Sequence, residues 1–326
     1  MVGKQWFQAM LAATLMAAGA LAQAQAVGAV NGSAQAARAF FQETRAAFSA
    51  HESRAADASV GPGAFAFSTT TDIQTLAQLG VVAQDWARQQ PRGAAPTAST
   101  IVFLVRAGNP KGIRDWSDLT RQEVHAVVSN PKLCNTGRYA YLAAWGSARE
   151  QGASDAQAAE FVGTLYRQAQ VLAKGEREAV AAFAREGQGD VLIALESDAG
   201  AIRESAGGSG LAVVYPSASV LVENPVALAV HGASESQLLE ARAYLTYLYT
   251  DEAQEIAARH GLRPQSAAVL ARHAENFKAI STFPVAKYFG SLELAQKVHF
   301  SAGGRFDQIW QPSAPQLAAA GARVPL

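Results

Sequence analysis

The spacing of apolar residues predicts an amphipathic helix near the start and then alternating strands and helices. Between Ala34 and Phe48, the residues Ala37, Phe40, Phe41, Thr44, Ala47 and Phe48 fall on one helical face. Short apolar runs predict strands at Ala64–Phe67, Thr100–Val105, Val124–Val128, Val191–Ala194, Ala212–Tyr215 and Val226–Val230. Helical patterns separate or follow these runs at Ile73–Leu79, Tyr139–Arg149, Ala156–Leu172, Glu178–Glu186, Glu235–Tyr249, Glu252–Arg259 and Gly303–Trp310. Strands that alternate with helices indicate an α/β architecture with parallel sheets.

The run TIVFLV from Thr100 to Val105 is apolar at nearly every position, which is typical of a strand buried on both faces. We therefore expect a buried parallel strand that ends at the turn Gly108-Asn109-Pro110. Beyond that turn, Asp115 or Ser117 is expected to cap a helix that buries Trp116.

The first residues have the pattern of a cleavable signal peptide. Lys4 precedes an Ala-rich apolar run from Ala9 to Ala22, and small residues follow up to Ala26. This run is shorter than the roughly 20 residues that span a bilayer. The only cysteine is Cys134, so neither a lipid-modified cleavage site nor an intramolecular disulfide is expected. These features predict a secreted chain that is held together by its apolar core.

Charge narrows the range of partners. The 27 acidic and 27 basic residues give a formal net charge of zero, and neither sign forms a long block. Nucleic acids and membrane surfaces usually require a basic patch, so neither is an expected partner.

A candidate ligand segment runs from Ser129 to Tyr141, because it leaves a strand, turns at Pro131 and enters a helix near Gly137. Asn135 and Thr136 are favourable helix caps, and a helix N-terminus after a strand favours anions. A capped helix without a ligand is the commoner outcome of such a pattern.

Enzymatic interpretations have little support in the sequence. Cys134 has no assignable histidine partner, which makes it a poor nucleophile candidate. The six histidines lack the spacing of a zinc site, and the glycines of the segment 207–210 lack the following lysine of a phosphate-binding loop. We therefore expect no catalytic residue, no metal and no cofactor.

Several long segments closely resemble the periplasmic sulfate-binding and thiosulfate-binding protein family. They are STIVFLVRAGNPKGIRDWSDL (99–119), NPK (130–132), YLAAWG (141–146), GDVLIA (189–194), YLYTDEAQEIAARHGLRP (247–264) and GGRFDQIW (303–310). The segments occur in the family's order and are spread along the chain from residue 99 to residue 310.

The resemblance implies a two-lobed type II periplasmic binding fold, in which each lobe is a mainly parallel sheet flanked by helices and an oxyanion binds in the cleft between the lobes. The expected divisions are 1–26 for the signal peptide, 27–105 with 222–326 for lobe 1 including the C-terminal helices, and 106–221 for lobe 2. Crossover segments are expected at Ser99–Arg106 and near Leu221–Ala229. The implied function is that of a monomeric periplasmic component of an ABC importer, which delivers a small inorganic anion, sulfate or thiosulfate, to permease subunits in the inner membrane.

The resemblance also implies a set of ligand positions, at which this chain departs from the family. The implied ligand residues are Gln35, Arg54, Cys134, Asn135, Thr136, Ala179 and Leu195. Gln35 replaces the family's Asp, Arg54 its Ser, the segment Cys134 to Thr136 its Ser-Gly-Gly, and Leu195 its Trp, while Ala179 offers a backbone N–H. Each lost donor costs about 1 to 3 kcal/mol if a buried ligand oxygen stays unpaired. Weaker sulfate binding is therefore expected.

Two alternatives remain open from the sequence. The first is a binding protein for another oxyanion or a small carboxylate that prefers the charge of Arg54, which otherwise pairs with Glu52. The second is a signalling or interaction protein without a transport function on the same fold.

Overall fold

The computed structural model describes residues 33–51, 65–67, 70–207, 210–230 and 234–310. They form two compact units, of which unit 1 lies within residues 34–98 and 223–273, and unit 2 within 99–222 and 274–310. The chain thus passes from one unit to the other at residues 98/99, 222/223 and 273/274. The predicted signal peptide lies outside the described residues.

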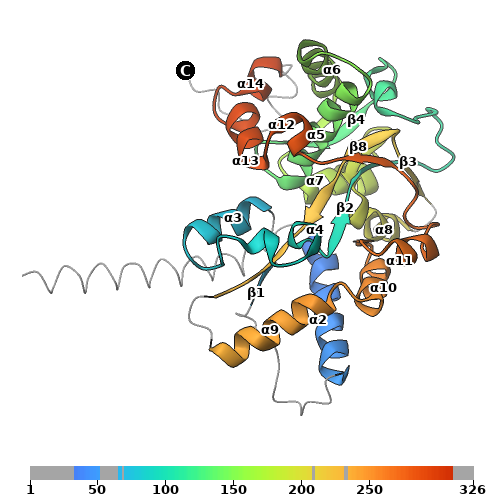
Figure 1. The fold of residues 1–326 in the computed structure, drawn as a ribbon. Helices are drawn as coiled ribbons and strands as arrows, with labels where there is room; N and C mark the ends of the chain where they lie inside the picture. Colours follow the sequence, from blue (N-terminus) through green and yellow to red (C-terminus); the bar gives the residue numbers. More distant parts are fainter. Residues whose placement is uncertain (1–32, 52–64, 68–69, 208–209, 231–233, 311–326) are drawn as a thin grey trace, which may run out of the picture. The chain divides into compact units, whose positions relative to one another are not determined.

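Unit 2 is built on a five-stranded sheet in the order β5-β4-β6-β3-β7. Of these strands, β3 and β4 are labelled in Figure 1. Its strands are β3 Ile101–Arg106, β4 Ala126–Ser129, β5 Val171–Ala173, β6 Val191–Leu195 and β7 Leu211–Val214. β4 is parallel to both of its neighbours, whereas β3 is antiparallel to β6 and to β7. Four of the strands therefore run in one direction and β3 runs against them.

The expectation of a parallel strand at Thr100–Val105 was wrong in direction and right in burial. Ile101, Phe103 and Val105 pack into one core, while Val102 and Leu104 pack into a second core on the other face of the sheet. Burial on both faces accounts for the continuous apolar run, because successive side chains of a strand point to opposite faces. An antiparallel central strand meets this requirement as well as a parallel one, so the run does not report direction.

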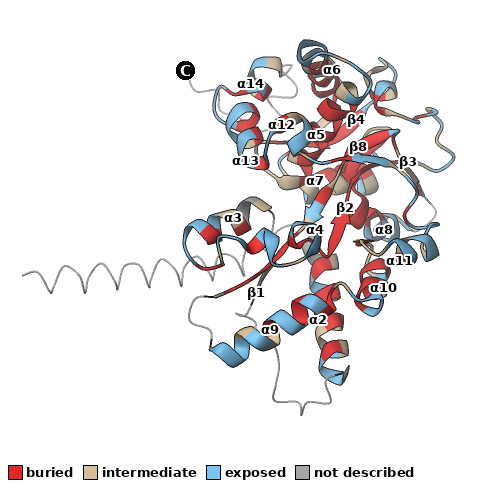
Figure 2. Cartoon of the chain, viewed as in Figure 1, coloured by how far each residue is buried: buried red, intermediate tan, exposed pale blue. Residues whose placement is uncertain are grey.

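Helices cover the sheet of unit 2, whose strands β3, β4 and β6 are almost entirely buried. Figure 2 shows the burial of β3 and β4. The helices are α5 Asn135–Glu150, α6 Asp155–Gln168, α7 Glu176–Val180, α8 Glu196–Ser205, α12 Ala286–Phe289, α13 Leu292–Ala295 and α14 Arg305–Ile309, with the short helices η2 Trp116–Thr120, η3 Ala181–Arg185 and η4 Gln296–Phe300. Two further strands, β8 Ala218–Val220 and β12 Ser281–Phe283, pair in parallel. α5 is the central helix, since every residue from Thr136 to Ser147 except Arg138 is buried.

The C-terminal segment differs from the expected division, which placed residues 222–326 in lobe 1. Residues 274–310 instead pack with unit 2. Phe283, Phe289, Phe300 and Phe306 join the same core as Tyr141 of α5. Burial of these aromatic rings holds the segment there, because each removes a large apolar area from water.

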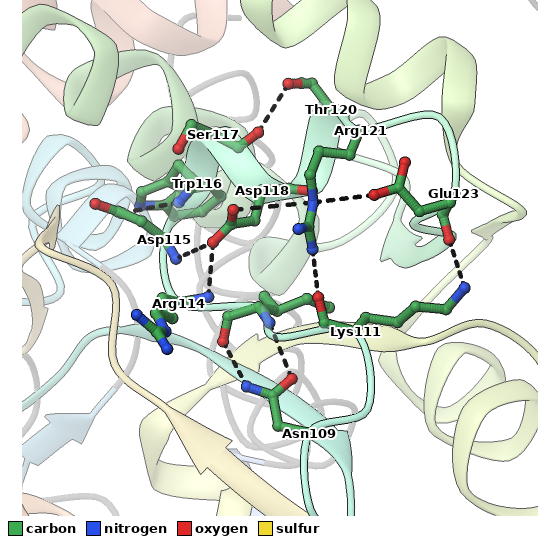
Figure 3. Close-up of polar contacts among 11 residues, drawn as sticks. Asn109, Lys111, Arg114, Asp115, Trp116, Ser117, Asp118, Thr120, Arg121 and Glu123 are labelled. Atoms are coloured by element: carbon green, nitrogen blue, oxygen red, sulfur yellow. Dashed lines mark hydrogen bonds and ion pairs between the residues drawn. The ribbon is translucent and has the colours of Figure 1, made fainter.

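The turn after β3 is fixed by a dense set of polar contacts (Figure 3). The side chain of Asn109 both accepts from and donates to the backbone of Ile113, at 3.0 and 2.7 Å. Asp115 and Asp118 form a reciprocal capping box at the start of η2. Trp116 is buried against Phe103 and donates its indole N–H to the carbonyl of Ala218 at 2.8 Å. The predicted cap at Asp115 and the core position of Trp116 are therefore confirmed.

Unit 1 contains smaller sheets and more helix. Its elements are α2 Ser33–His51, β1 Phe65–Phe67, α3 Thr70–Gln78, η1 Trp86–Arg88, α4 Pro91–Ala94, β2 Thr97–Ser99, β9 Val222–Asn224, β10 Val226–Leu228, α9 Glu235–Tyr247, α10 Asp251–Arg259, β11 Arg263–Pro264 and α11 Ala267–Arg272. β1 pairs with β10, and β2 pairs with β11, both antiparallel. A mainly parallel sheet was expected in each lobe. It is found in unit 2, whereas these two strand pairs of unit 1 are antiparallel.

The early helix was predicted correctly, because α2 buries the expected face. Phe40 and Phe48 join the core of unit 1, and the Thr44 hydroxyl lies 2.7 Å from the Tyr244 hydroxyl. Phe48 also packs edge-on against Tyr244.

Candidate functional site

Three helices of unit 2 begin at one edge of its sheet. β5, β4 and β6 are adjacent and parallel, so their carboxyl ends lie at the same edge. α5 follows β4, α7 follows β5 and α8 follows β6. Ligands of α/β proteins collect at such edges because the first turn of each helix offers N–H groups and a positive dipole end. We call the first turns of α5, α7 and α8 the strand-edge site.

The start of α5 is held tightly to the end of β4. The N-cap is Cys134, whose Sγ accepts the N–H of Gly137 at 3.4 Å. The expectation that Asn135 or Thr136 caps this helix was therefore wrong. Gly137 allows this approach, since a Cβ there would lie 2.5 Å from the carbonyl oxygen of Ser129. The backbone N–H of Asn130 also donates to Ala173 of β5, at 2.8 Å. Packing of this kind fixes the direction of the α5 N-terminus.

A chain of polar side chains connects the three helix starts. Thr136 of α5 is buried, and its hydroxyl donates to Oε2 of Glu176, the first residue of α7, at 3.2 Å. Glu176 in turn shares a hydrogen bond with Asp198 in the first turn of α8. The strand-edge site therefore already contains two carboxyl groups from the protein itself.

Asp198 is the more deeply buried of the two acids, with 5% of its surface exposed. Desolvation raises the pKa of Asp198 well above its usual range, and the charge and hydrogen bond of Glu176 raise it further. A protonated Asp198 can donate to Glu176. Among the described residues, Oδ2 of Asp198 and the hydroxyl of the neighbouring Ser197 are buried without a hydrogen-bond partner. Buried polar atoms without partners are uncommon, and they mark a place where a ligand or water completes the site.

Some backbone donors of the site are already used. The N–H of Glu196 donates to the carbonyl of Thr100 at 2.8 Å, and the N–H of Ser197 donates to the hydroxyl of Ser99 at 3.1 Å. The first turn of α5 is different, because the N–H groups of Asn135 and Thr136 precede the helix's own hydrogen bonds. Donors for a ligand thus come mainly from α5.

The chemistry of the site suits binding better than nucleophilic attack. Burial raises the pKa of the Cys134 thiol, and the N–H of Gly137 offsets this only in part. A thiol that stays protonated is a weak nucleophile. Within the described parts of the chain, no group of three metal-ligating side chains occurs, and no helix has the length and apolar character needed to cross a membrane.

Comparison with known proteins gives consistent relatives. The family of bacterial extracellular solute-binding proteins matches residues 9–263. The thiosulfate-binding protein of Pseudomonas aeruginosa is 44% identical over 245 residues, which are 74% of each chain. The sulfate-binding protein of Escherichia coli is 41% identical over 240 residues, which are 73% of each chain. The chain belongs to the sulfate- and thiosulfate-binding protein family.

Solved structures agree with this family assignment. The sulfate-binding protein SubI of Mycobacterium tuberculosis superposes with a TM-score of 0.61 at 31% identity, covering 71% of this chain and 79% of that one. A ferric iron-binding protein of Mannheimia haemolytica has a TM-score of 0.60 at 14% identity, covering 83% and 94%, and supports the fold alone. The family thus has the two-lobed type II fold that the resemblance implied, and the α/β class is confirmed.

Of the ligand residues that the resemblance implied, the structure brings three together. Cys134, Asn135 and Thr136 lie consecutively at the start of α5. Asn135 accepts from Arg138 at 2.8 Å through its side-chain oxygen, whereas Thr136 faces Glu176. Whether these residues hold a ligand stays a prediction.

The positions of Ala179 and Leu195 do not favour direct contact with an anion. The N–H of Ala179 donates to the carbonyl of Gly175 at 3.1 Å, inside α7. Leu195 precedes α8, and its buried side chain belongs to the apolar core on one face of the sheet. Neither residue therefore has a donor turned to the strand-edge site.

Of the other two expected ligand residues, Gln35 lies in the first turns of α2, in unit 1. Arg54 lies outside the described residues.

Glu176 and Asp198 were missed as site residues. A sequence signal existed, since each is an acid within three residues after a short strand and lies in the first turn of the next helix. Acidic residues in the first turn of a helix are usually interpreted as N-caps or as partners of the helix dipole. The sequence pattern therefore did not indicate a role in the site. Their pairing depends on the adjacency of β5, β4 and β6, which the sequence pattern does not contain.

Proposed function

We propose that this chain is the periplasmic substrate-binding component of a sulfate-type ABC importer and that it captures a tetrahedral oxyanion. The sulfate- and thiosulfate-binding relatives support the ligand class. The observation that carries the proposal is the convergence of three helix N-termini at the strand-edge site. Such termini favour an anion through their aligned dipoles, and the first turn of α5 adds N–H groups that precede the helix's own hydrogen bonds.

The role is binding and delivery, without catalysis. The thiol of Cys134 is kept neutral by burial, so the site offers hydrogen bonds and no activated nucleophile. Delivery requires permease subunits in the inner membrane as partners, and the predicted signal peptide takes the chain to the periplasm.

Thermal unfolding of the mature protein tests the ligand class. A ligand that binds the native state alone raises the melting temperature, and at a concentration 100 times its Kd it adds about 2.7 kcal/mol of stability. Sulfate, thiosulfate and inorganic phosphate are compared with acetate, which represents a small carboxylate. We expect saturable stabilisation by at least one tetrahedral oxyanion. Stabilisation by acetate alone would support a carboxylate ligand, and no response to any of the four anions would contradict the proposal.

A further inference from the structure

The turn at residues 130–133 joins β4 to Cys134, the N-cap of α5. Its first residue is tied to the sheet, because the N–H of Asn130 donates to the carbonyl of Ala173 in β5 at 2.8 Å. The side chain of Asn130 accepts the N–H of Lys132 at 2.9 Å, and its carbonyl accepts the N–H of Cys134 at 3.2 Å. The position of this turn therefore sets where the first turn of α5 begins.

The C-terminal segment contacts the same turn through an ion pair. The ammonium nitrogen of Lys132 lies 2.7 and 2.6 Å from the two carboxylate oxygens of Asp307, in α14. The two side chains are only 28% and 31% exposed, so water and salt screen this pair less than they screen an ion pair on the open surface. We call this pair the Lys132–Asp307 clamp.

The carboxylate of the clamp is itself held in place. One oxygen of Asp307 also accepts the N–H of Gly303, at 2.8 Å. The preceding residue, Phe306, is fully buried and packs edge-on against Tyr141 of α5 and Tyr166 of α6. Movement of α14 would uncover this ring, and close-packed aromatic contacts resist such a shift. The acid of the clamp thus has a fixed position relative to α5.

We propose that the Lys132–Asp307 clamp is a positioning device for anion binding, through which the C-terminal segment sets the direction of the α5 N-terminus. Lys132 lies two residues before the N-cap, so the clamp acts on the backbone that leads into the N–H groups of the first turn. The carboxylate of Asp307 balances the charge of Lys132, and the pair adds position to the strand-edge site without adding net charge. This inference rests on the proposed oxyanion function.

A second ion pair joins the C-terminal segment to the other end of α5. Lys287 of α12 donates to Glu150, the last residue of α5, which also accepts from the Tyr288 hydroxyl at 2.9 Å. α5 has 16 residues, so at a rise of about 1.5 Å per residue this pair lies roughly 22 Å from the helix start. It connects the same two parts of the chain without reaching the strand-edge site, and it is the matched control for the clamp.

Isothermal titration of the mature protein with sulfate and with thiosulfate measures what the clamp contributes to affinity. Lys132→Gln and Asp307→Asn each remove one charge of the clamp, and the double variant removes both. We expect each of the three variants to weaken anion binding about five- to tenfold, with no further loss in the double variant, because two residues that act through one contact are not additive. Lys132→Arg should keep the affinity within about twofold of the wild type, since a guanidinium also pairs with a carboxylate.

Glu150→Gln and Lys287→Gln separate positioning from general stability. Chemical denaturation should show small losses of stability of similar size for the variants of both ion pairs. The anion affinity of Glu150→Gln and of Lys287→Gln should nevertheless stay within about twofold of the wild type, because sites this far apart behave independently. Circular dichroism of each variant confirms that it is folded.

Three results would overturn the role of the clamp and leave the oxyanion function intact. The first is wild-type affinity in all three clamp variants, and the second is an equal loss of affinity in the clamp and control variants. The third is tighter binding by Asp307→Asn with weaker binding by Lys132→Gln, which would show that the charge of Lys132 acts on the anion directly. No binding of either anion by the wild type would contradict the proposed function itself.

Discussion

Two carboxyl groups of this protein, Glu43 in unit 1 and Asp198 in unit 2, lie in opposite surroundings. In unit 1, Glu43 accepts from Arg259 and from His260, and hydrogen bonds from these two side chains hold the pKa of Glu43 below its usual range. In unit 2, Asp198 is buried beside another acid, and desolvation raises its pKa. A carboxyl group on the surface with basic partners is thus stable as an anion, whereas the acid at the strand-edge site is stable when protonated. The raised pKa of Asp198 means that its burial lowers the stability of the folded protein at a pH where the free carboxyl group is ionised.

The opposite pKa shifts give opposite effects of pH. For Glu43, whose folded pKa is lowered, the stabilisation is present above the unfolded pKa and is lost as pH falls through the folded value. For Asp198, whose folded pKa is raised, the folded state is favoured at low pH, and stability falls as pH rises from the unfolded pKa towards the folded one. Only the second effect depends on the buried strand edge.

The largest effect is expected from filling the contact between α5 and β4. In Gly137→Ala, the added Cβ meets the backbone of Ser129 and Asn130 within 2.7 Å, so the helix start must move. We expect a loss of about 1 to 3 kcal/mol in the free energy of unfolding and a clear loss of anion affinity. Chemical denaturation and titration measure the two effects.

A second glycine at the same edge provides the control for that substitution. A Cβ at Gly175 meets nothing within 4 Å, and its backbone is extended. Gly175→Ala should therefore change stability by less than about 0.5 kcal/mol. Equal losses for the two variants would mean that close packing at the strand edge is not what positions α5.

Replacement of the ionisable carboxyl group of Asp198 should have the next largest effect. In Asp198→Asn, the group no longer needs a proton to remain buried, so we expect stabilisation by about 1 to 2 kcal/mol near neutral pH. The gain should shrink as pH falls below the unfolded pKa of Asp, because the wild type is then protonated in both states. Urea denaturation over that range measures it, and an effect that is equal at every pH would show that burial does not shift the pKa of Asp198.

The smallest effect is expected in unit 1. Glu43→Gln removes contacts to Arg259 and His260, but the side chain of Glu43 is 42% exposed, and water screens much of the attraction. We expect a loss of about 0 to 1 kcal/mol near neutral pH, which decreases as salt is added. A larger loss that does not depend on salt would remove the contrast between the surface acid Glu43 and the buried acid Asp198.

The sequence by itself determined the local elements and the family. Helical periodicity predicted α2, and the apolar run from Thr100 to Val105 predicted a strand buried on both faces. Hydrophobic spacing reports which faces of an element are buried, and this is the property that it predicted correctly. Segments that resemble the family, such as the one from Ser99 to Leu119, added the two-lobed fold, which periodicity does not contain.

Tertiary structure decided strand direction, the position of the C-terminal segment and the composition of the site. β3 is antiparallel to its neighbours, and the aromatic residues after residue 274 pack with unit 2. An apolar pattern shows that a segment is buried, but it specifies neither the direction of a strand nor the unit against which the segment packs. Thr136, Glu176 and Asp198 are separated by 40 and 22 residues in the chain and meet because three parallel strands end at one edge. Hydrogen bonds between such distant residues follow from sheet order, and sheet order is fixed only when the core is packed.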